Sequence, residues 1–282
     1  MSWDALRSKL LGLWAGLALL YLFVPIFVVV LFSFNDPKGR FNLTWSGFTL
    51  DHWKDPFSVN GLSTAFSNSI EIALLSTLIA VALGTFMALA LVRYGFWGRR
   101  AVDLFVFLPL ATPEVVLGAA LLGLFVTLNV ATGFVTIVIA HVMFNVSYVV
   151  VTVKARLEGM DTHIEEAAMD LGANQFVTFR KITLPMIAPG VAAAALLAFA
   201  ISIDDFVITY FNAGQVTTFP LFIYGIERRG VPPEVNVLAS LILLVSLVAM
   251  AANLIVQRRA AARARAPEPE PAVPGQPAAQ LA

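Results

Sequence analysis

Charge is scarce in this sequence, and neither sign predominates. Only 13% of the 282 residues are charged, whereas a soluble domain carries about 25%. The 18 basic and 18 acidic residues balance, so the composition lacks the positive excess typical of nucleic-acid-binding chains. Hydrophobic residues make up 59% of the chain. We therefore expect an integral membrane protein that binds no nucleic acid.

Residues for covalent, metal or phosphate chemistry are also missing. Cysteine is absent, which excludes disulfides, thiolate metal sites and cysteine nucleophiles. His52, His141 and His163 are too scattered to give a metal-ligand spacing. No G-x-x-x-x-G-K-[ST] phosphate-binding loop occurs. We predict a chain that is not an enzyme, holds no metal or cofactor, and depends on a partner for any energy from ATP.

Long apolar runs, in contrast, are abundant. A transmembrane helix needs about 20 apolar residues, and six segments satisfy this length. The first is too long for a secretion signal and lacks a small-residue cleavage site, so it is expected to remain as a helix. The segments cover residues 10–34, 70–92, 104–128, 131–153, 187–211 and 235–256.

The distribution of Lys and Arg predicts the orientation, because cytoplasmic loops carry the excess of these residues. With the N-terminus inside, the outer loops hold only Lys38, Arg40, Lys54, Arg228 and Arg229. The thirteen on the inner side are Arg7, Lys9, Arg93, Arg99, Arg100, Lys154, Arg156, Arg180, Lys181, Arg258, Arg259, Arg263 and Arg265. We predict an all-α, multi-pass protein of six transmembrane helices with both ends in the cytoplasm.

This topology divides the chain into three parts. Residues 1–9 form a cytoplasmic N-terminus, and residues 10–257 form the membrane domain. The external loop over 35–69 contains Trp45 and Trp53, which suit a partly structured interfacial segment. Residues 258–282 are rich in Ala and Pro and are expected to be a disordered cytoplasmic tail.

The cytoplasmic segment 154–186 reads "KARLEGMDTHIEEAAMDLGANQFVTFRKITLPM". Thr162 and Glu165 have the spacing of a capping box, which predicts a helix from His163. Gly172 provides the left-handed residue that ends this helix. A second short helix, capped by Asn174, is expected to end near Pro185. From periodicity alone, the pair could equally be an amphipathic hairpin lying on the membrane.

The same segment resembles a known signature. It matches E-A-A-x3-G-x9-I-x-L-P at every position and spacing, and this signature belongs to the membrane subunits of bacterial binding-protein-dependent ABC importers. The resemblance implies a type I importer permease fold (MetI-like) with a cytoplasmic coupling helix. The matching residues are Glu166, Ala167, Ala168, Gly172, Ile182, Leu184 and Pro185.

Further stretches resemble one branch of that family, the second permease subunit of spermidine/putrescine importers. They are "YLFVPIFVVVLFSFN", "VVTVKARLEGMD", "SIDDFVITYFNAG" and "GVPPEVNVLASLILLVSL". The resemblance implies ATP-driven import of polyamines into the cytoplasm by alternating access. Glu71 departs from it, because an uncharged polar residue is expected there.

The resemblance also implies partners and a location. A dimer of ATP-binding subunits would bind ATP and Mg and receive the coupling helix in a groove. A second, homologous permease would complete a heterodimer, and an extracytoplasmic polyamine-binding protein would deliver the solute. The complex would lie in the bacterial inner membrane.

Acidic residues inside apolar segments are the candidates for the solute pathway, since an intramembrane charge is costly and commonly functional. Glu114 lies about 15 Å along the third segment, and Asp204 lies about 25 Å along the fifth. Asp205 follows directly, and Phe206, Tyr210 and Phe211 could offer aromatic faces to a cation. Adjacent helical residues differ by about 100°, so one aspartate is expected to face the pathway and the other a neighbouring helix or subunit.

Other interpretations remain for these residues. The carboxylates could be protonated, or hydrogen-bonded to Ser202, Thr209 or a neighbouring helix. His141 and Asn145 lie one turn apart in the fourth segment, which favours hydrogen bonding between helices.

Other functions also remain possible. The same architecture could carry another cation, such as thiamine or ferric iron. An ATP-independent secondary transporter would not need the complete coupling signature. An intramembrane aspartyl protease would need two facing aspartates rather than neighbours on one helix.

Overall fold

The computed structural model describes residues 3–39, 41–226 and 230–264, and within these ranges the fold is helical. A single isolated bridge pairs Asn35 with Phe48 in the external loop. Of the predictions above, the tail beyond 264 lies outside the described residues, as do Arg40, Arg228, Arg229 and Arg265.

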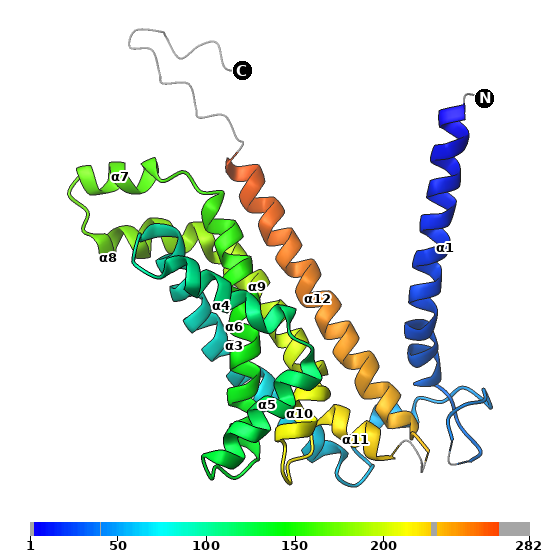
Figure 1. Cartoon of the computed structure of the whole chain (residues 1–282). Coiled ribbons are helices and arrows are strands. Elements are labelled where there is room, and N and C mark those ends of the chain that lie inside the picture. Colours follow the sequence, from blue (N-terminus) through cyan, green and yellow to red (C-terminus); the bar gives the residue numbers. More distant parts are fainter. Residues whose placement is uncertain (1–2, 40, 227–229, 265–282) are drawn as a thin grey trace.

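Three helices form the core of the bundle: α3 (Leu62–Arg93), α6 (Phe134–Glu158) and α9 (Leu184–Asp204) (Figure 1). Small residues on α3 allow α6 to approach closely, as is common between membrane helices. A Cβ added to Gly84 would lie 2.7 Å from the Cβ of Val149. The helices therefore pack along a glycine-containing face of α3 that excludes larger side chains.

Helices α1 (Trp3–Phe32) and α12 (Pro233–Ala264) lie outside this core. Figure 1 shows α1 standing apart from the bundle along most of its length. Its main contact is with α12, and its most apolar window has no buried residue. Helix α12 extends past residue 257, so the expectation of a disordered tail from 258 was wrong as far as Ala264.

The third apolar segment is two helices, α4 (Arg99–Ala111) and α5 (Glu114–Thr127), bent by 109°. The expectation of one continuous span over 104–128 was therefore wrong. Pro113 explains the break, because a proline has no N–H group and disfavours helical geometry in the residue before it. Thr112 accordingly has extended angles, with φ −90° and ψ 133°.

The fifth apolar segment is also interrupted. Helix α9 ends at Asp204, and α10 (Val207–Asn212) begins after a two-residue break in which Asp205 is extended. The continuous span predicted over 187–211 was therefore wrong. The chain continues through α11 (Phe219–Ile226), which packs on α3.

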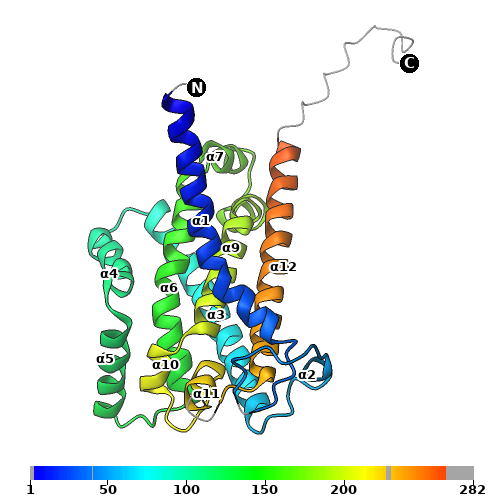
Figure 2. The ribbon, with the colours of Figure 1, turned by 90° about the vertical axis from the view of Figure 1, so that its right-hand side faces the viewer.

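The number of spans agrees with the sequence. Among the described residues, five helices are long and apolar enough to cross a membrane, and the bent α4–α5 pair raises the number to six. The start of α1, the end of α12, α7 (His163–Asp170) and α8 (Gln175–Thr178) lie at one end of the molecule. The short α2 (Asp51–Lys54) lies at the opposite end, as an external segment should (Figure 2).

The external loop is folded onto the end of the bundle. The side chain of Asn35 donates hydrogen bonds to the Asn42 side chain at 2.7 Å and to the Thr44 carbonyl at 2.8 Å. Trp53 stacks on Phe34 with ring centroids 5.1 Å apart. The expectation of a partly structured segment is confirmed.

Candidate functional site

The cytoplasmic segment forms the predicted pair of short helices. Helix α7 begins at His163, as expected, and ends at Asp170. Gly172 follows with φ +92°, in the left-handed region where other residues are strained. The Asn174 side chain accepts a hydrogen bond from the amide of Val177 at 2.9 Å and caps α8. The two helices therefore meet at a glycine elbow.

The second helix does not end near Pro185, so that prediction was wrong. A five-residue π-helix, η1 (Phe179–Thr183), joins α8 directly to α9. Pro185 lies in the first turn of α9, directly after the π-helix. This cytoplasmic segment is thus continuous with a transmembrane helix. Because π-turns concentrate at functional sites, this junction belongs to the candidate site.

The predicted capping box is also wrong, because the Thr162 side chain makes no capping hydrogen bond. Instead, the Asp161 carboxylate accepts bonds from the His163 amide at 3.0 Å and binds the His163 ring nitrogen at 2.7 Å. This contact, together with the charges of Asp161 and Glu166, raises the pKa of His163 above 6.5.

The signature residues are distributed over the outer surface of this segment. Glu166 and Ala167 are exposed, and Ala168 is half-buried. Leu171 is 91% exposed and Phe176 is 68% exposed, so large apolar side chains flank the elbow. Small and apolar groups around an exposed helix suit insertion into a groove on a partner. In the following junction Ile182 is half-buried, whereas Leu184 and Pro185 are exposed.

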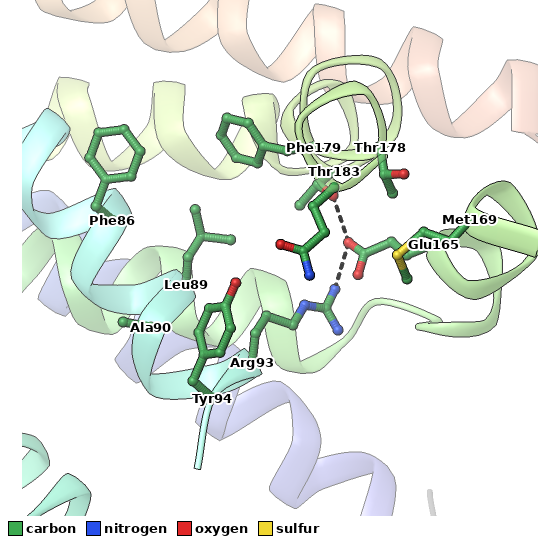
Figure 3. A pocket seen from close by; sticks show the side chains of 11 residues that line it. Phe86, Leu89, Ala90, Arg93, Tyr94, Glu165, Met169, Thr178, Phe179 and Thr183 are labelled. Atoms are coloured by element: carbon green, nitrogen blue, oxygen red, sulfur yellow. Dashed lines mark hydrogen bonds and ion pairs between the residues drawn. The ribbon is translucent and has the colours of Figure 1, made fainter. Parts of the chain in front are cut away.

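Glu165, the residue before the signature, points back toward the membrane domain. Its carboxylate pairs with the Arg93 guanidinium at 2.9 Å and accepts a hydrogen bond from the Thr183 hydroxyl at 2.7 Å (Figure 3). Both charged side chains are less than one-fifth exposed. This clamp of Glu165, Arg93 and Thr183 ties α7 to the end of α3 and to η1. This clamp was not predicted from the sequence.

A cavity of about 370 Å³ adjoins the clamp. Figure 3 shows side chains of α3 on one side and those of η1 and α7 on the other. The lining is formed by Phe86, Leu89, Ala90, Arg93, Tyr94, Glu165, Met169, Gln175, Thr178, Phe179 and Thr183.

The two aspartates of the fifth segment lie in different environments. Asp204, the last residue of α9, is exposed. The Asp205 side chain is only 8% exposed. Its carboxylate accepts hydrogen bonds from the Thr209 amide at 2.7 Å and the Thr209 hydroxyl at 2.8 Å. Asp205 thus satisfies free N–H groups at the start of α10, as the hydrogen-bonding alternative proposed.

His141 connects this break to the core. Its ring nitrogens contact the Ser202 hydroxyl at 2.6 Å and the Thr209 hydroxyl at 2.9 Å, and Nε2 lies 3.3 Å from the Asp205 carboxylate. Ser202 also bonds to Ser76 of α3 at 3.0 Å. The prediction of hydrogen bonding between helices is confirmed for His141 but not for Asn145, whose buried side-chain amide has no partner among the described residues. The network fixes the backbone from which Asp204 projects.

Three aromatic rings gather just beyond Asp204. Phe206 lies 5.6 Å from Tyr210 and 4.9 Å from Tyr224, measured between ring centroids. Tyr210 and Tyr224 are more than half exposed. Tyr224 was not predicted from the sequence, because it lies on α11 and shares no spacing with the other two. An exposed carboxylate near aromatic faces can attract an organic cation.

Glu114 is not in the middle of a helix, as the sequence suggested. It is the exposed first residue of α5, at the bend after Pro113, where the helix dipole favours a negative charge. Helix α5 packs on α10, and a Cβ added to Gly118 would lie 2.7 Å from the Phe211 ring. Glu114 and Asp204 are therefore exposed acids at the ends of helices belonging to two broken spans.

Comparison with known proteins gives close relatives. The family model described as "Binding-protein-dependent transport system inner membrane component" matches residues 80–262. The chain is 38% identical over 240 residues to the spermidine/putrescine transport system permease protein PotC of Haemophilus influenzae, covering 85% of this chain and 93% of that protein. It is 40% identical over 231 residues to the putrescine transport system permease protein PotI of Escherichia coli, covering 79% and 82%.

Solved structures share the fold at low sequence identity. A bacterial ABC transporter involved in the import of the acidic polysaccharide alginate matches 91% of this chain and 97% of its own, with a TM-score of 0.64 and 17% identity. The MetNI methionine ABC transporter, in an inward-facing conformation, matches 71% and 94%, with a TM-score of 0.55 and 16% identity. These similarities extend over nearly the whole of the matched chains.

Proposed function

The chain belongs to the family of inner membrane components of binding-protein-dependent transport systems, and from this premise we propose that it carries polyamines into the cytoplasm. Its relatives are named as permeases for spermidine and putrescine. As a permease subunit it moves the solute across the membrane, and in our proposal ATP and Mg are bound by a separate subunit.

One observation within the chain supports a polyamine as the solute. The exposed Asp204 ends α9 two residues before Phe206, whose ring contacts those of Tyr210 and Tyr224. A polyamine is a flexible chain bearing separate ammonium groups, which a carboxylate can pair and aromatic faces can attract. An anion pathway would need hydrogen-bond donors and positive charge instead. We assign Asp204 to the pathway, with Glu114 as a second exposed acid.

This assignment gives the two aspartates separate roles. The Asp205 carboxylate accepts hydrogen bonds from Thr209 and contacts His141. We therefore propose that it holds the backbone at the break between α9 and α10 rather than contacting the solute. Asp204 then meets the ammonium group. The two adjacent aspartates would therefore serve as one pathway residue and one structural residue.

The coupling surface is proposed to be the elbow of α7 and α8. Glu166, Ala167 and the exposed Leu171 would enter a groove on a dimer of ATP-binding subunits. The continuous helix from α8 through η1 to α9 supports this role, because a push on the elbow reaches α9 without crossing a loop. Closure of the ATP-binding dimer would then alternate the access of the pathway.

A second permease subunit is proposed to cover α1. That helix exposes an apolar surface on all sides except its contact with α12. A neighbouring homologous subunit would bury part of it, and lipid would cover the rest. An extracytoplasmic binding protein would deliver the solute at the end that carries α2.

Uptake by the reconstituted complex tests the proposal. Proteoliposomes containing both permeases and the ATP-binding subunits are supplied with the binding protein and with spermidine, putrescine, thiamine or ferric iron in parallel. We expect ATP-dependent uptake of the two polyamines. Preferential uptake of thiamine or iron would contradict the assigned solute, and uptake that needs no ATP would contradict the coupling role.

A further inference from the structure

The cavity beside the clamp has two chemically different walls (Figure 3). Phe86, Leu89 and Ala90 of α3 and Phe179 of η1 form an apolar wall. The other wall is polar and includes the Arg93 guanidinium, the Thr178 and Thr183 hydroxyls, the Glu165 carboxylate and the Gln175 amide. With a volume of about 370 Å³, the cavity is large enough for part of an amphiphilic molecule.

Two buried polar atoms in its lining lack a partner within the described part of the chain. They are Nε of Arg93 and the hydroxyl oxygen of Thr178. Thr178 is only 5% exposed, so bulk water does not readily satisfy its hydroxyl. Burying such groups without a hydrogen bond is unfavourable. The Arg93 group can only donate and the Thr178 hydroxyl can donate too, so an occupant with acceptor oxygens would satisfy both.

The cavity lies at the inner boundary of the membrane. Arg93 is the last residue of α3, and Phe86 lies seven residues earlier, about 10 Å deeper along the helix axis. Phe86 and Tyr94 are 64% and 61% exposed, so the lining reaches the surface of the subunit. An occupant from the inner leaflet would therefore find apolar groups at acyl-chain depth and polar groups at headgroup depth.

The surrounding charge favours an anion. Arg93 neutralises Glu165, while Arg180 and Lys181 are exposed on η1 between the lining residues Phe179 and Thr183. Basic pockets at the cytoplasmic side of membrane helices suit anionic headgroups. We propose that the cavity binds an anionic phospholipid of the inner leaflet, with its acyl chain along α3 and its phosphate or ester oxygens at Arg93 and Thr178.

Lipid retention tests this site without reference to the transported solute. The complete complex is placed in nanodiscs of phosphatidylethanolamine and phosphatidylglycerol. Native mass spectrometry then counts the phosphatidylglycerol molecules that stay bound when the complex is released from the nanodisc. Ala90→Trp fills the cavity and should lower retention. Ala82→Trp, which adds the same side chain to an exposed position two turns earlier on α3, should retain phosphatidylglycerol as the unmodified complex does.

A second, nearly isosteric variant distinguishes loss of the lipid site from misfolding. Thr178→Val removes the unpartnered hydroxyl and should weaken retention roughly fivefold, corresponding to one lost hydrogen bond. The same spectra report whether the complex is intact. Equal retention by Ala90→Trp, Ala82→Trp and the unmodified complex would overturn the proposal. Equal retention of phosphatidylethanolamine and phosphatidylglycerol would overturn the requirement for an anionic headgroup.

Discussion

Asp204 and Asp205 are adjacent in the sequence, yet only Asp204 is exposed, while the Asp205 carboxylate is held by the Thr209 amide and hydroxyl at 2.7 and 2.8 Å. The break between α9 and α10 creates this difference. In a continuous helix the two side chains would project from the same helix axis in directions about 100° apart. Here the second aspartate caps the next helix, and the first is left available to a solute.

Asp205→Asn should destabilise the subunit by about 1–3 kcal/mol, because a buried hydrogen-bonding group then lacks its partner. We expect a lower thermal midpoint of the purified complex and a lower yield of assembled complex. Asp204→Asn is the matched control, since the same chemical change at an exposed position should leave the midpoint unchanged. Equal midpoints for the two variants would contradict the structural role of Asp205.

Glu165→Gln should loosen α7 from α3, since a hydrogen bond between charged groups contributes about 1.5–3 kcal/mol. We expect more ATP hydrolysed per spermidine imported, because the elbow would move without carrying α3 with it. Exchanging the charges, with Arg93→Glu and Glu165→Arg together, should restore part of the coupling.

The Lys154–Asp103 pair provides the control for that experiment. It joins α6 to α4 at 2.7 Å, away from α7. Asp103→Asn should therefore leave the ratio of ATP to spermidine unchanged. A ratio that is also unchanged in Glu165→Gln would show that the clamp does not transmit the coupling movement.

Gly172→Trp should abolish ATP-coupled uptake while the protein remains in the membrane. The left-handed φ of +92° is strained for any side chain, and the indole would project from the elbow into the proposed groove. Gly172→Asn is the matched substitution, because asparagine tolerates this conformation better and is small. Uptake that survives in the tryptophan variant would argue against docking at this elbow.

His163 gives a pH-dependent contact at the start of α7. Asp161 raises the pKa of His163 above 6.5, so the stabilisation from this pair is complete below the unfolded pKa and is lost as pH rises through the folded value. The pKa of Asp161 is lowered, chiefly by the His163 amide, so its contribution is present above the unfolded pKa of the carboxyl and is lost as pH falls through the lowered value.

Asp161→Asn should therefore return the pKa of His163 toward its ordinary value. NMR of the complex with isotopically labelled histidine can follow this titration, because the chain has only three histidines. The same titration in Glu166→Gln should change less, since the charge of Glu166 is a smaller cause of the shift. A His163 pKa that is unaffected by Asp161→Asn would contradict the contact.

The apolar runs predicted the number of spans but not the two interruptions within them. The two interruptions have different physical origins. The bend at Thr112 and Pro113 is encoded locally, since proline restricts the residue before it. The break at Asp204 and Asp205 carries no proline or glycine. It depends on Asp205 reaching Thr209 and His141, and the contact with His141 on α6 exists only after the helices have packed.

The proposed coupling segment likewise combines features encoded in the local sequence with a contact that depends on packing. The start of α7 at His163 and the left-handed Gly172 were predicted correctly from local sequence, because helix ends and elbows are local features. Arg93 lies 72 residues from Glu165, so no spacing rule could pair them. The apparent capping box was misleading, since Glu165 gains more from an ion pair and a hydroxyl than from the start of its own helix.

Uptake kinetics of Asp204→Asn test the central claim most directly. In ATP-loaded proteoliposomes of the complete complex, we expect kcat/KM for spermidine to fall roughly tenfold, as one charge-assisted contact is lost, while the thermal midpoint stays unchanged. Asp204→Glu should retain much of the uptake, because it keeps the carboxylate. Spermidine kinetics unchanged in Asp204→Asn would contradict the assignment of this aspartate to a cation pathway.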